Sequence, residues 1–294
     1  VDLSAFGGSA TQALTNNAGS WTATYLIDSN SKNGSTLNAA VTVTDNAGNS
    51  TGPVADASNI TIDTSAPVVT DGNISVTGVT SGSGTSGTFI AGDTLTLTWD
   101  NTASGDNNSD IASATVDLSA FGGSLTEVLV NNAGSWTATY NITSGSTNGS
   151  DLNATVTAMD VAGNSTGPVA DTSNITIESI VPVVTDNNIS VSGSSGTAGS
   201  FIAGDTLTLT WDNTASGDNN SDIASATVDL SAFGGNPTQT LINSADSWSA
   251  TYTIDSNSVS DSDLNATVTV VDTVGNSIGP IADTTDISID SSVI

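Results

Sequence analysis

The sequence contains no cysteine, no histidine and a single basic residue, Lys32. The absence of cysteine excludes a disulfide framework and thiol chemistry. Without histidine, and with one lysine, the Ser-His-Asp and Cys-His arrangements of nucleophilic catalysis cannot be assembled. A glycosidase-like pair of carboxylates remains possible. However, the repeats described below are nearly identical, so no acidic residue of one repeat is distinguished from its counterparts as a catalytic residue. We therefore expect a protein that is not an enzyme.

Positive charge is almost missing, since 30 acidic residues face that one lysine and the formal net charge is −29. Nucleic-acid binding and attachment to anionic membranes both require clustered Lys and Arg, so neither is expected. No apolar run is long enough to insert into a membrane. The chain still has an ordinary globular content of apolar residues, 36%, which favours a folded protein over a disordered one. Such a negative field attracts cations.

Internal repetition is the strongest pattern in the chain. The octapeptide VDLSAFGG begins at Val1, Val116 and Val228, and a 30-residue segment starting TLTLTWD is identical at Thr94 and Thr206. Blocks that recur in the same order at a common offset indicate tandem copies of one structural unit.

Two prolines mark the joints between the copies. Pro67 and Pro182 each follow a strand-like ITI and a few short residues, and each precedes a β-branched run. Proline fixes φ and lacks an N–H, which suits the entry to an edge strand. These marks predict repeats at residues 66–180 and 181–294. Residues 1–65 are then the back half of a repeat, either cut from a longer array or completed by strands from a neighbouring chain.

Within a repeat the hydrophobic period is two. Leu95, Leu97 and Trp99 alternate with threonine, and Trp136 and Ala138 alternate in the same way. This alternation is typical of half-buried antiparallel strands. About seven such strands, separated by Gly, Asn, Asp and Ser clusters, predict an all-β fold of tandem immunoglobulin-like β-sandwich domains. We expect all five tryptophans to pack in the cores and the alternating threonines to face outward.

Acidic residues gather in the loops and linkers. Closely spaced Asp and Asn side chains supply the hard oxygen ligands that Ca²⁺ prefers, although the spacing is not that of an EF-hand. A solvated turn, in which Asx side chains bond their own backbone, is the alternative. The candidate metal ligands are Asp63, Asp100, Asp106, Asp110, Asp160, Glu178, Asp212, Asp218, Asp222 and Asp272.

Three acidic segments are expected to meet at each joint between repeats. In a sandwich of this type, the loop after the second strand and the loop after the sixth strand lie at the end where the preceding linker enters. That linker carries Asp63 before the second repeat and Glu178 before the third. Such a convergence of like charges is unfavourable without a cation. The sequence therefore predicts Ca²⁺ between neighbouring repeats.

Tandem units joined by D-T-x-A-P linkers, with D-x-A-G-N loops and few basic residues, resemble the extender repeats of giant bacterial surface adhesins of the RTX and biofilm-associated types. The resemblance implies a secreted, cell-surface array stiffened by interdomain Ca²⁺, which contacts a host or other surface only through regions outside this segment. Its metal positions fall on Asp63, Asp100, Asp160, Glu178, Asp212 and Asp272. The linker departs from the pattern at Glu178, and the glycine-rich RTX nonapeptide is absent.

Three functions are therefore open. The first is a non-catalytic spacer whose partners are the neighbouring repeats of the same chain. The second is the subunit of a self-assembling filament, sheath or surface layer, in which other copies of the chain complete the first unit. The third is a glycan-binding module that uses its tryptophans.

Overall fold

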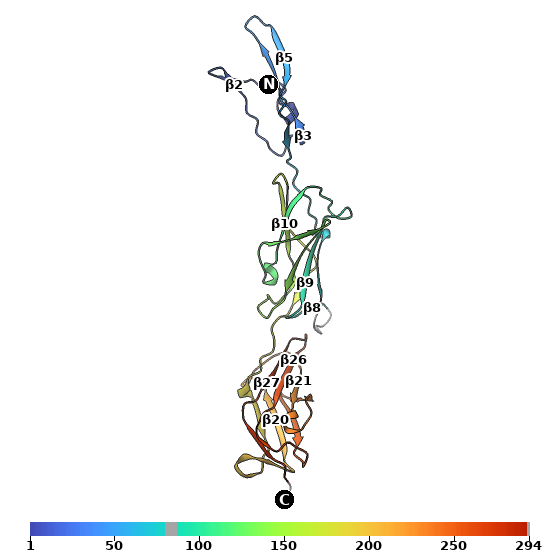
Figure 1. Ribbon diagram of the computed structural model, residues 1–294, viewed down its shortest axis with the longest axis vertical. Coiled ribbons are helices and arrows are strands. Elements are labelled where there is room, and N and C mark those ends of the chain that lie inside the picture. The colour runs from blue at the N-terminus through green and yellow to red at the C-terminus, as the bar shows by residue number, and fades with distance from the viewer. Residues whose placement is uncertain (80–86, 293–294) are drawn as a thin grey trace.

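The computed structural model describes residues 1–79 and 87–292 and is all-β, with only short 3₁₀ turns between strands. Three units follow one another along a rod, with the N- and C-termini at opposite ends (Figure 1). Within the described residues, no helix has the length and apolar character needed to cross a membrane.

The second unit is a sandwich of two four-stranded sheets, one in the order β12-β13-β9-β7 and the other in the order β11-β10-β15-β16. A small third sheet, β14-β17-β8, contains a parallel pair. The strands are β7 (Ile74–Val79), β8 (Thr88–Phe89), β9 (Thr94–Asp100), β10 (Ile111–Asp117), β11 (Glu127–Val128), β12 (Val130–Asn132), β13 (Ser135–Asn141), β14 (Gly149–Leu152), β15 (Thr155–Asp160), β16 (Ser165–Ala170) and β17 (Ile175–Ile177).

The third unit repeats this topology, with sheets β18-β20-β24-β23, β22-β21-β26-β27 and β19-β28-β25. Its strands are β18 (Ile189–Ser192), β19 (Phe201–Ile202), β20 (Thr206–Asp212), β21 (Ile223–Asp229), β22 (Gln239–Thr240), β23 (Ile242–Ser244), β24 (Ser247–Thr253), β25 (Asp261–Leu264), β26 (Thr267–Asp272), β27 (Ser277–Ala282) and β28 (Ile287–Asp290). The predicted immunoglobulin-like β-sandwich fold is confirmed.

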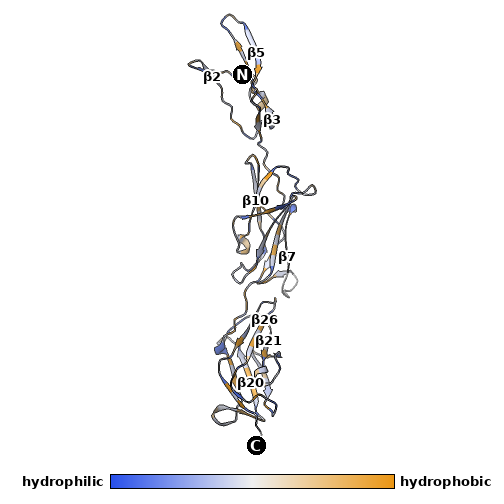
Figure 2. Cartoon of the chain, viewed as in Figure 1, coloured by the Kyte–Doolittle hydropathy of each residue, from blue (hydrophilic) through white to orange (hydrophobic). Residues whose placement is uncertain are grey.

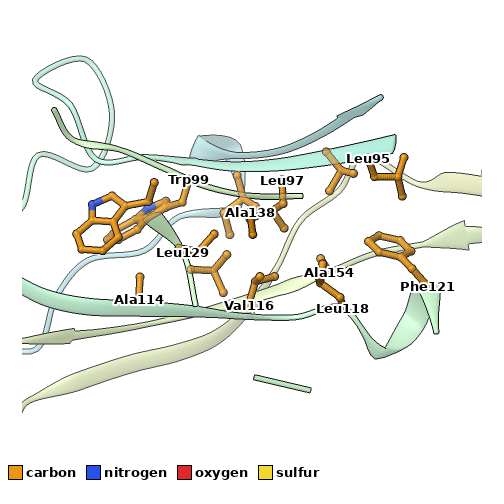
Figure 3. Close-up of a cluster of buried hydrophobic side chains, with 14 of the residues drawn as sticks. Leu95, Leu97, Trp99, Ala114, Val116, Leu118, Phe121, Leu129, Ala138 and Ala154 are labelled. Atoms are coloured by element: carbon orange, nitrogen blue, oxygen red, sulfur yellow. The ribbon is translucent and has the colours of Figure 1, made fainter. Parts of the chain in front are cut away.

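The core of each complete unit follows from the alternation of its strands. Leu95, Leu97 and Trp99 are at most 2% exposed, while the threonines between them are only half-buried. They pack against β10 and β15 of the facing sheet in one cluster (Figure 3). Figure 2 shows apolar residues along the strands of the units, among them β10. Trp99 and Trp136 are paired across β9 and β13, with ring centroids 6.0 Å apart.

A tyrosine hydroxyl forms hydrogen bonds that hold the loop after strand β10 in place. The Tyr140 hydroxyl donates to the carbonyl of Phe121 at 2.9 Å and also contacts the Ser146 hydroxyl at 2.7 Å. Phe121 ends a 3₁₀ turn, η3 (Ser119–Phe121), and is fully buried. The first unit repeats the contact between Tyr25 and Phe6.

The first unit has a back half only, and its apolar face is open. Its strands are β1 (Thr15–Asn17), β2 (Ser20–Thr22), β3 (Gly34–Leu37), β4 (Ala40–Thr44), β5 (Ser50–Ala55) and β6 (Ile60–Ile62), which pair as β1-β2, β4-β5 and β3-β6. Its buried cluster consists of Leu3, Phe6 and Ile62. The prediction that all five tryptophans are core residues is wrong for Trp21, which is 61% exposed because no strand of the described residues covers it.

Many aspartates of this chain cap their own turns. Asp2, Asp117 and Asp229 each accept a hydrogen bond from the backbone N–H two residues further on, at 2.8 Å. Hydrogen bonds from the side chain and from the backbone N–H of the serine at that position lower the pKa of all three carboxyls. Such Asx turns satisfy backbone donors in loops without a basic partner.

Candidate metal centres at the two joints

The D-x-x-G-N loop between β15 and β16 folds around one carboxylate. Asp160 accepts hydrogen bonds from the Asn164 backbone N–H at 2.8 Å and from the Asn164 side-chain amide at 2.9 Å. Its side chain is 2% exposed. Burial raises the pKa of Asp160, but the hydrogen bonds from Asn164 and the loop backbone outweigh it, so the pKa lies below its usual value. The residue is therefore an ionised carboxylate held in a fixed position.

This loop does not need a joint to form. In the first unit the same loop lies away from both joints, and Asp45 accepts the same pair of bonds from Asn49 at 2.8 and 2.9 Å. The local hydrogen bonds thus come from the loop sequence, and the joint adds further groups to a preformed element.

At the first joint the structure brings together Asp63, Asp110 and Asp160. One carboxylate oxygen from each lies within 4.8 Å of the other two. Asp63 directly follows the last strand of the first unit, Asp110 ends the loop before β10, and Asp160 ends β15. One carboxylate therefore comes from the preceding unit and two from the following unit.

The second joint has the same construction, with Glu178, Asp222 and Asp272 within the same 4.8 Å limit. Asp272 is 3% exposed and accepts three backbone N–H bonds from its loop. Asp222 is exposed. Its backbone carbonyl accepts from the N–H of Thr273 at 2.8 Å, which holds the two loops together.

The linker is anchored to the following unit beside each trio. The Asn164 side-chain amide donates to the backbone carbonyl of Asp63 at 3.2 Å. The Asn276 amide likewise donates to the carbonyl and the carboxylate of Glu178, both at 3.1 Å, and its oxygen accepts from the Ala91 N–H of the preceding unit at 3.3 Å. The side chains of Asn164 and Asn276 therefore form hydrogen bonds between consecutive units. Sequence reasoning did not assign them a role, although their place at the end of the repeated D-x-x-G-N loop was a usable signal.

Hollows flank the trios on the surface. One is lined by Ile27, Asp63, Asp110 and Val161, and the other by Glu178, Pro182, Asn220 and Asp222, among other residues. Both hollows lie where residues of two consecutive units meet.

Four predicted ligands are not in the trios. Asp106 faces inward and accepts bonds from the Trp99 indole N–H at 2.7 Å, from Thr70 and from Asn73. Burial raises the pKa of Asp106, and these hydrogen bonds lower it further than burial raises it. Asp100 caps its own turn through the N–H of Thr102 at 2.8 Å.

Asp212 and Asp218 repeat these contacts in the third unit. Asp218 accepts from the Trp211 indole N–H at 2.7 Å, and Asp212 accepts from the N–H of Thr214 at 2.9 Å. In each loop one carboxylate therefore lies at the joint, a second accepts from the buried indole of the sandwich, and a third caps its own turn.

The charge of a trio has no local compensation at the second joint. Lys32, the one basic side chain, belongs to the first unit. Two carboxylates about 4.8 Å apart repel by about 1 kcal/mol in water-like surroundings and more where water is displaced. A donor set made only of carboxylates, amides and carbonyls matches a hard cation such as Ca²⁺, and it does not match zinc or copper.

No protein-family model matches the chain, and no curated protein is significantly similar to it in sequence. Among solved structures, the fibronectin(III)-like modules of Clostridium thermocellum CbhA align with 14% identity and a TM-score of 0.30, over 74% of this chain and 95% of that one. A Bacteroides ovatus protein, SGBP-B of the mixed-linkage glucan utilization locus, solved with a heptasaccharide, aligns with 16% identity and a TM-score of 0.19. This alignment spans 95% of the present chain and 64% of the Bacteroides chain. At these scores neither likeness carries an argument about function, and the chain's own repeats define its architecture.

Proposed function

We propose that this chain is a non-catalytic spacer segment of an extracellular bacterial adhesin, in which Ca²⁺ binds between consecutive units and stiffens the rod. The observation that carries the proposal is the composition of the two trios. Each takes one carboxylate from the end of one unit and two from the next. A cation that binds all three resists bending at the joint, because bending separates its ligands.

The carboxylates of the proposed sites are Asp63, Asp110 and Asp160 at the first joint and Glu178, Asp222 and Asp272 at the second. Ca²⁺ takes six to eight oxygen ligands and tolerates irregular geometry. Three carboxylates would be supplemented by nearby backbone carbonyls and by water. Mg²⁺ demands an octahedron and retains its own water, so we expect it to bind more weakly.

The remaining parts of the proposal rest on composition and repetition. The chain has no histidine or cysteine, and its complete repeats share an identical 30-residue segment. Binding modules that recognise different ligands differ in their exposed loops, whereas identical loops suit a part that sets length. The likeness to adhesin extender repeats and the cell-surface location belong to the same proposal.

The test is thermal unfolding of the chain in excess EGTA, in millimolar Ca²⁺ and in millimolar Mg²⁺, with small-angle scattering of each sample. A site at 100 times its dissociation constant adds about 2.7 kcal/mol to the bound state. We expect Ca²⁺ to raise the melting temperature by several degrees and to narrow the distribution of molecular lengths, with a smaller effect of Mg²⁺. Identical melts and identical scattering with and without Ca²⁺ would refute the proposal.

A further inference from the structure

Two asparagine–glycine dipeptides lie beside the joints. Asn33-Gly34 and Asn148-Gly149 are the two places in the sequence where an asparagine directly precedes a glycine. They occupy the same position of the repeat, with the glycine as the first residue of β3 and of β14. The third unit has Ser260-Asp261 at this position. A dipeptide that is rare in this asparagine-rich chain is thus confined to one structural place.

The Asn148 side chain connects the start of β14 to the linker. Its Oδ1 accepts from the backbone N–H of Ser179 at 2.7 Å, and the Ser179 hydroxyl lies 2.7 Å from the same oxygen. That hydroxyl also lies 3.0 Å from the carbonyl of Ser146, so its one proton can serve either acceptor. The Asn148 amide nitrogen donates to Oε1 of Glu178, a carboxylate of the second trio, at 3.4 Å.

Asn33 makes the same contacts at the first joint. Its Oδ1 accepts from the backbone N–H of Thr64 at 3.0 Å and from the Thr64 hydroxyl at 2.8 Å. Its amide nitrogen donates to Oδ1 of Asp63 at 3.5 Å. In the third unit the hydroxyl of Ser260 accepts from the N–H of Ser291 at 2.9 Å. A serine can therefore hold this part of the chain, and the fold itself does not require an amide here.

Asparagine followed by glycine undergoes a reaction of its own. The backbone nitrogen of the glycine, after it loses its proton to water or hydroxide, attacks Cγ of the asparagine. A C–N bond forms, the side-chain nitrogen leaves as ammonia, and a succinimide ring results. One water molecule then opens the ring to aspartate or isoaspartate, so the net reaction consumes one water and releases one ammonia. Glycine favours the attack because it has no Cβ to crowd the nitrogen.

The contacts of Asn148 bear on this reaction in two ways. Attack at Cγ places negative charge on Oδ1, and hydrogen-bond donors aimed at such an oxygen stabilise that charge. The N–H of Ser179 is such a donor, and the Asn148 side chain is exposed to water. The pairing of Gly149 with Ile177 opposes closure of the ring. The reaction therefore requires the end of the short strand β14 to open, which is the kind of local opening that costs least.

We propose that Asn33 and Asn148 are sites of spontaneous deamidation, and that the reaction gives each joint a fourth carboxylate. The new oxygen takes the place of the amide nitrogen that now donates to Asp63 or Glu178. Asn148 lines the same surface hollow as Glu178 and Asp222. A favourable contact between an amide and a carboxylate thus becomes a contact between like charges, and each joint gains one negative charge as the protein ages.

The consequence for metal binding rests on the proposed function. Without Ca²⁺, the added carboxylate repels Glu178 and weakens the joint. With Ca²⁺, it supplies a further charged oxygen of the kind that this cation binds. A deamidated joint should therefore be less stable than the original joint in EGTA and should gain more from Ca²⁺. The variant Asn148→Asp reproduces the aspartate product at the second joint.

The test follows the folded full chain in EGTA at mildly alkaline pH, below its melting temperature, and locates mass changes in chymotryptic peptides. We expect the mass gain of one deamidation at Asn33 and at Asn148, at rates within about tenfold of those in short unstructured peptides of the same sequence. A Gly149→Ala chain should react at least about tenfold more slowly at Asn148 and normally at Asn33. An alanine Cβ at this position has the flexible Leu152 side chain as its nearest neighbour, at 3.3 Å.

Two results would overturn the proposal. The first is a folded chain that stays unchanged at both positions while the peptides convert fully. The second is an Asn148→Asp chain that melts at the same temperature as the parent in EGTA, which would show that the new carboxylate does not meet Glu178. Both results are obtained without Ca²⁺ and so do not depend on whether the trios bind metal. If the masses change as expected but Ca²⁺ stabilises neither chain, the proposed function fails and the modification stands.

Discussion

Removal of one carboxylate from the second trio gives the sharpest prediction, because Ca²⁺ should offset the stabilising effect that the change has in EGTA. Asp222 is exposed, and Asp222→Asn leaves its backbone bond to Thr273 intact. Without Ca²⁺ the substitution removes two like-charge repulsions, with Glu178 and Asp272, over distances within 4.8 Å. Each repulsion is about 1 kcal/mol in water-like surroundings. The variant should therefore be more stable than the parent chain in EGTA, by about 1–2 kcal/mol at low salt.

With Ca²⁺ present, the same substitution removes a charged ligand. A tenfold loss of affinity lowers the metal-linked stabilisation from about 2.7 to about 1.4 kcal/mol, at a Ca²⁺ concentration 100 times the parent dissociation constant. For a unit of about 100 residues, 1 kcal/mol corresponds to about 4–8 °C in melting temperature. Calorimetric scans in EGTA and in Ca²⁺ should thus show a clearly smaller Ca²⁺-induced shift for Asp222→Asn.

Two variants make this measurement decisive. Glu127→Gln makes the same change in charge on β11, away from both trios, and should leave the Ca²⁺-induced shift unchanged. Asp110→Asn should reproduce the effect at the first joint. If Asp222→Asn changes the melting temperature equally in EGTA and in Ca²⁺, the second trio does not bind the metal and the reasoning fails.

Two further predictions concern the sandwiches themselves. Tyr140→Phe removes the 2.9 Å hydrogen bond to the Phe121 carbonyl. The substitution should destabilise the second unit by about 1–2 kcal/mol and lower the urea concentration at which that unit is half unfolded. An unchanged urea midpoint would show that the hydroxyl contributes nothing to stability. The hydrogen bonds from Trp211 and its neighbours hold the pKa of Asp218 below its usual value against the opposing effect of burial. Because a depressed folded-state pKa stabilises above the unfolded value of about 3.9 and the gain is lost as pH falls through the folded value, Asp218→Asn should weaken the third unit at pH 7 and flatten its loss of stability below about pH 4. An acid slope equal to that of the parent would contradict this.

The sandwich was predictable from sequence because its strands alternate strictly. Leu95, Leu97 and Trp99 face inward, as their spacing requires. Strand β16 was not predicted, because its STGPVA sequence contains Gly167 and Pro168 and lacks an apolar alternation. It is the edge strand of its sheet, which is where a proline is tolerated.

The site was only partly predictable. The expected topology placed the acidic residue of the linker and the D-x-x-G-N loop at the same end of the sandwich. The structure brings Asp63 and Asp160 together there. Within the D-N-T-A-S-G-D-N-N-S-D loop, spacing alone did not distinguish Asp100, Asp106 and Asp110. The resemblance favoured Asp100, whereas the trio contains Asp110. What separates them is the direction of each side chain. Asp106 turns to the Trp99 indole, and no spacing rule states that an indole N–H is buried beneath that loop.

The Asx turns also determine how two such rods interact side by side. Because carboxylates such as Asp2, Asp117 and Asp229 are held by their own backbone rather than by lysine or arginine, the rod carries no mosaic of opposite charges through which a parallel neighbour could adhere. Two such rods that lie side by side should therefore repel each other at separations up to about 10 Å at 0.1 M salt. We expect parallel rods to stay apart, at a closest spacing that is set by the ionic strength of the surrounding water.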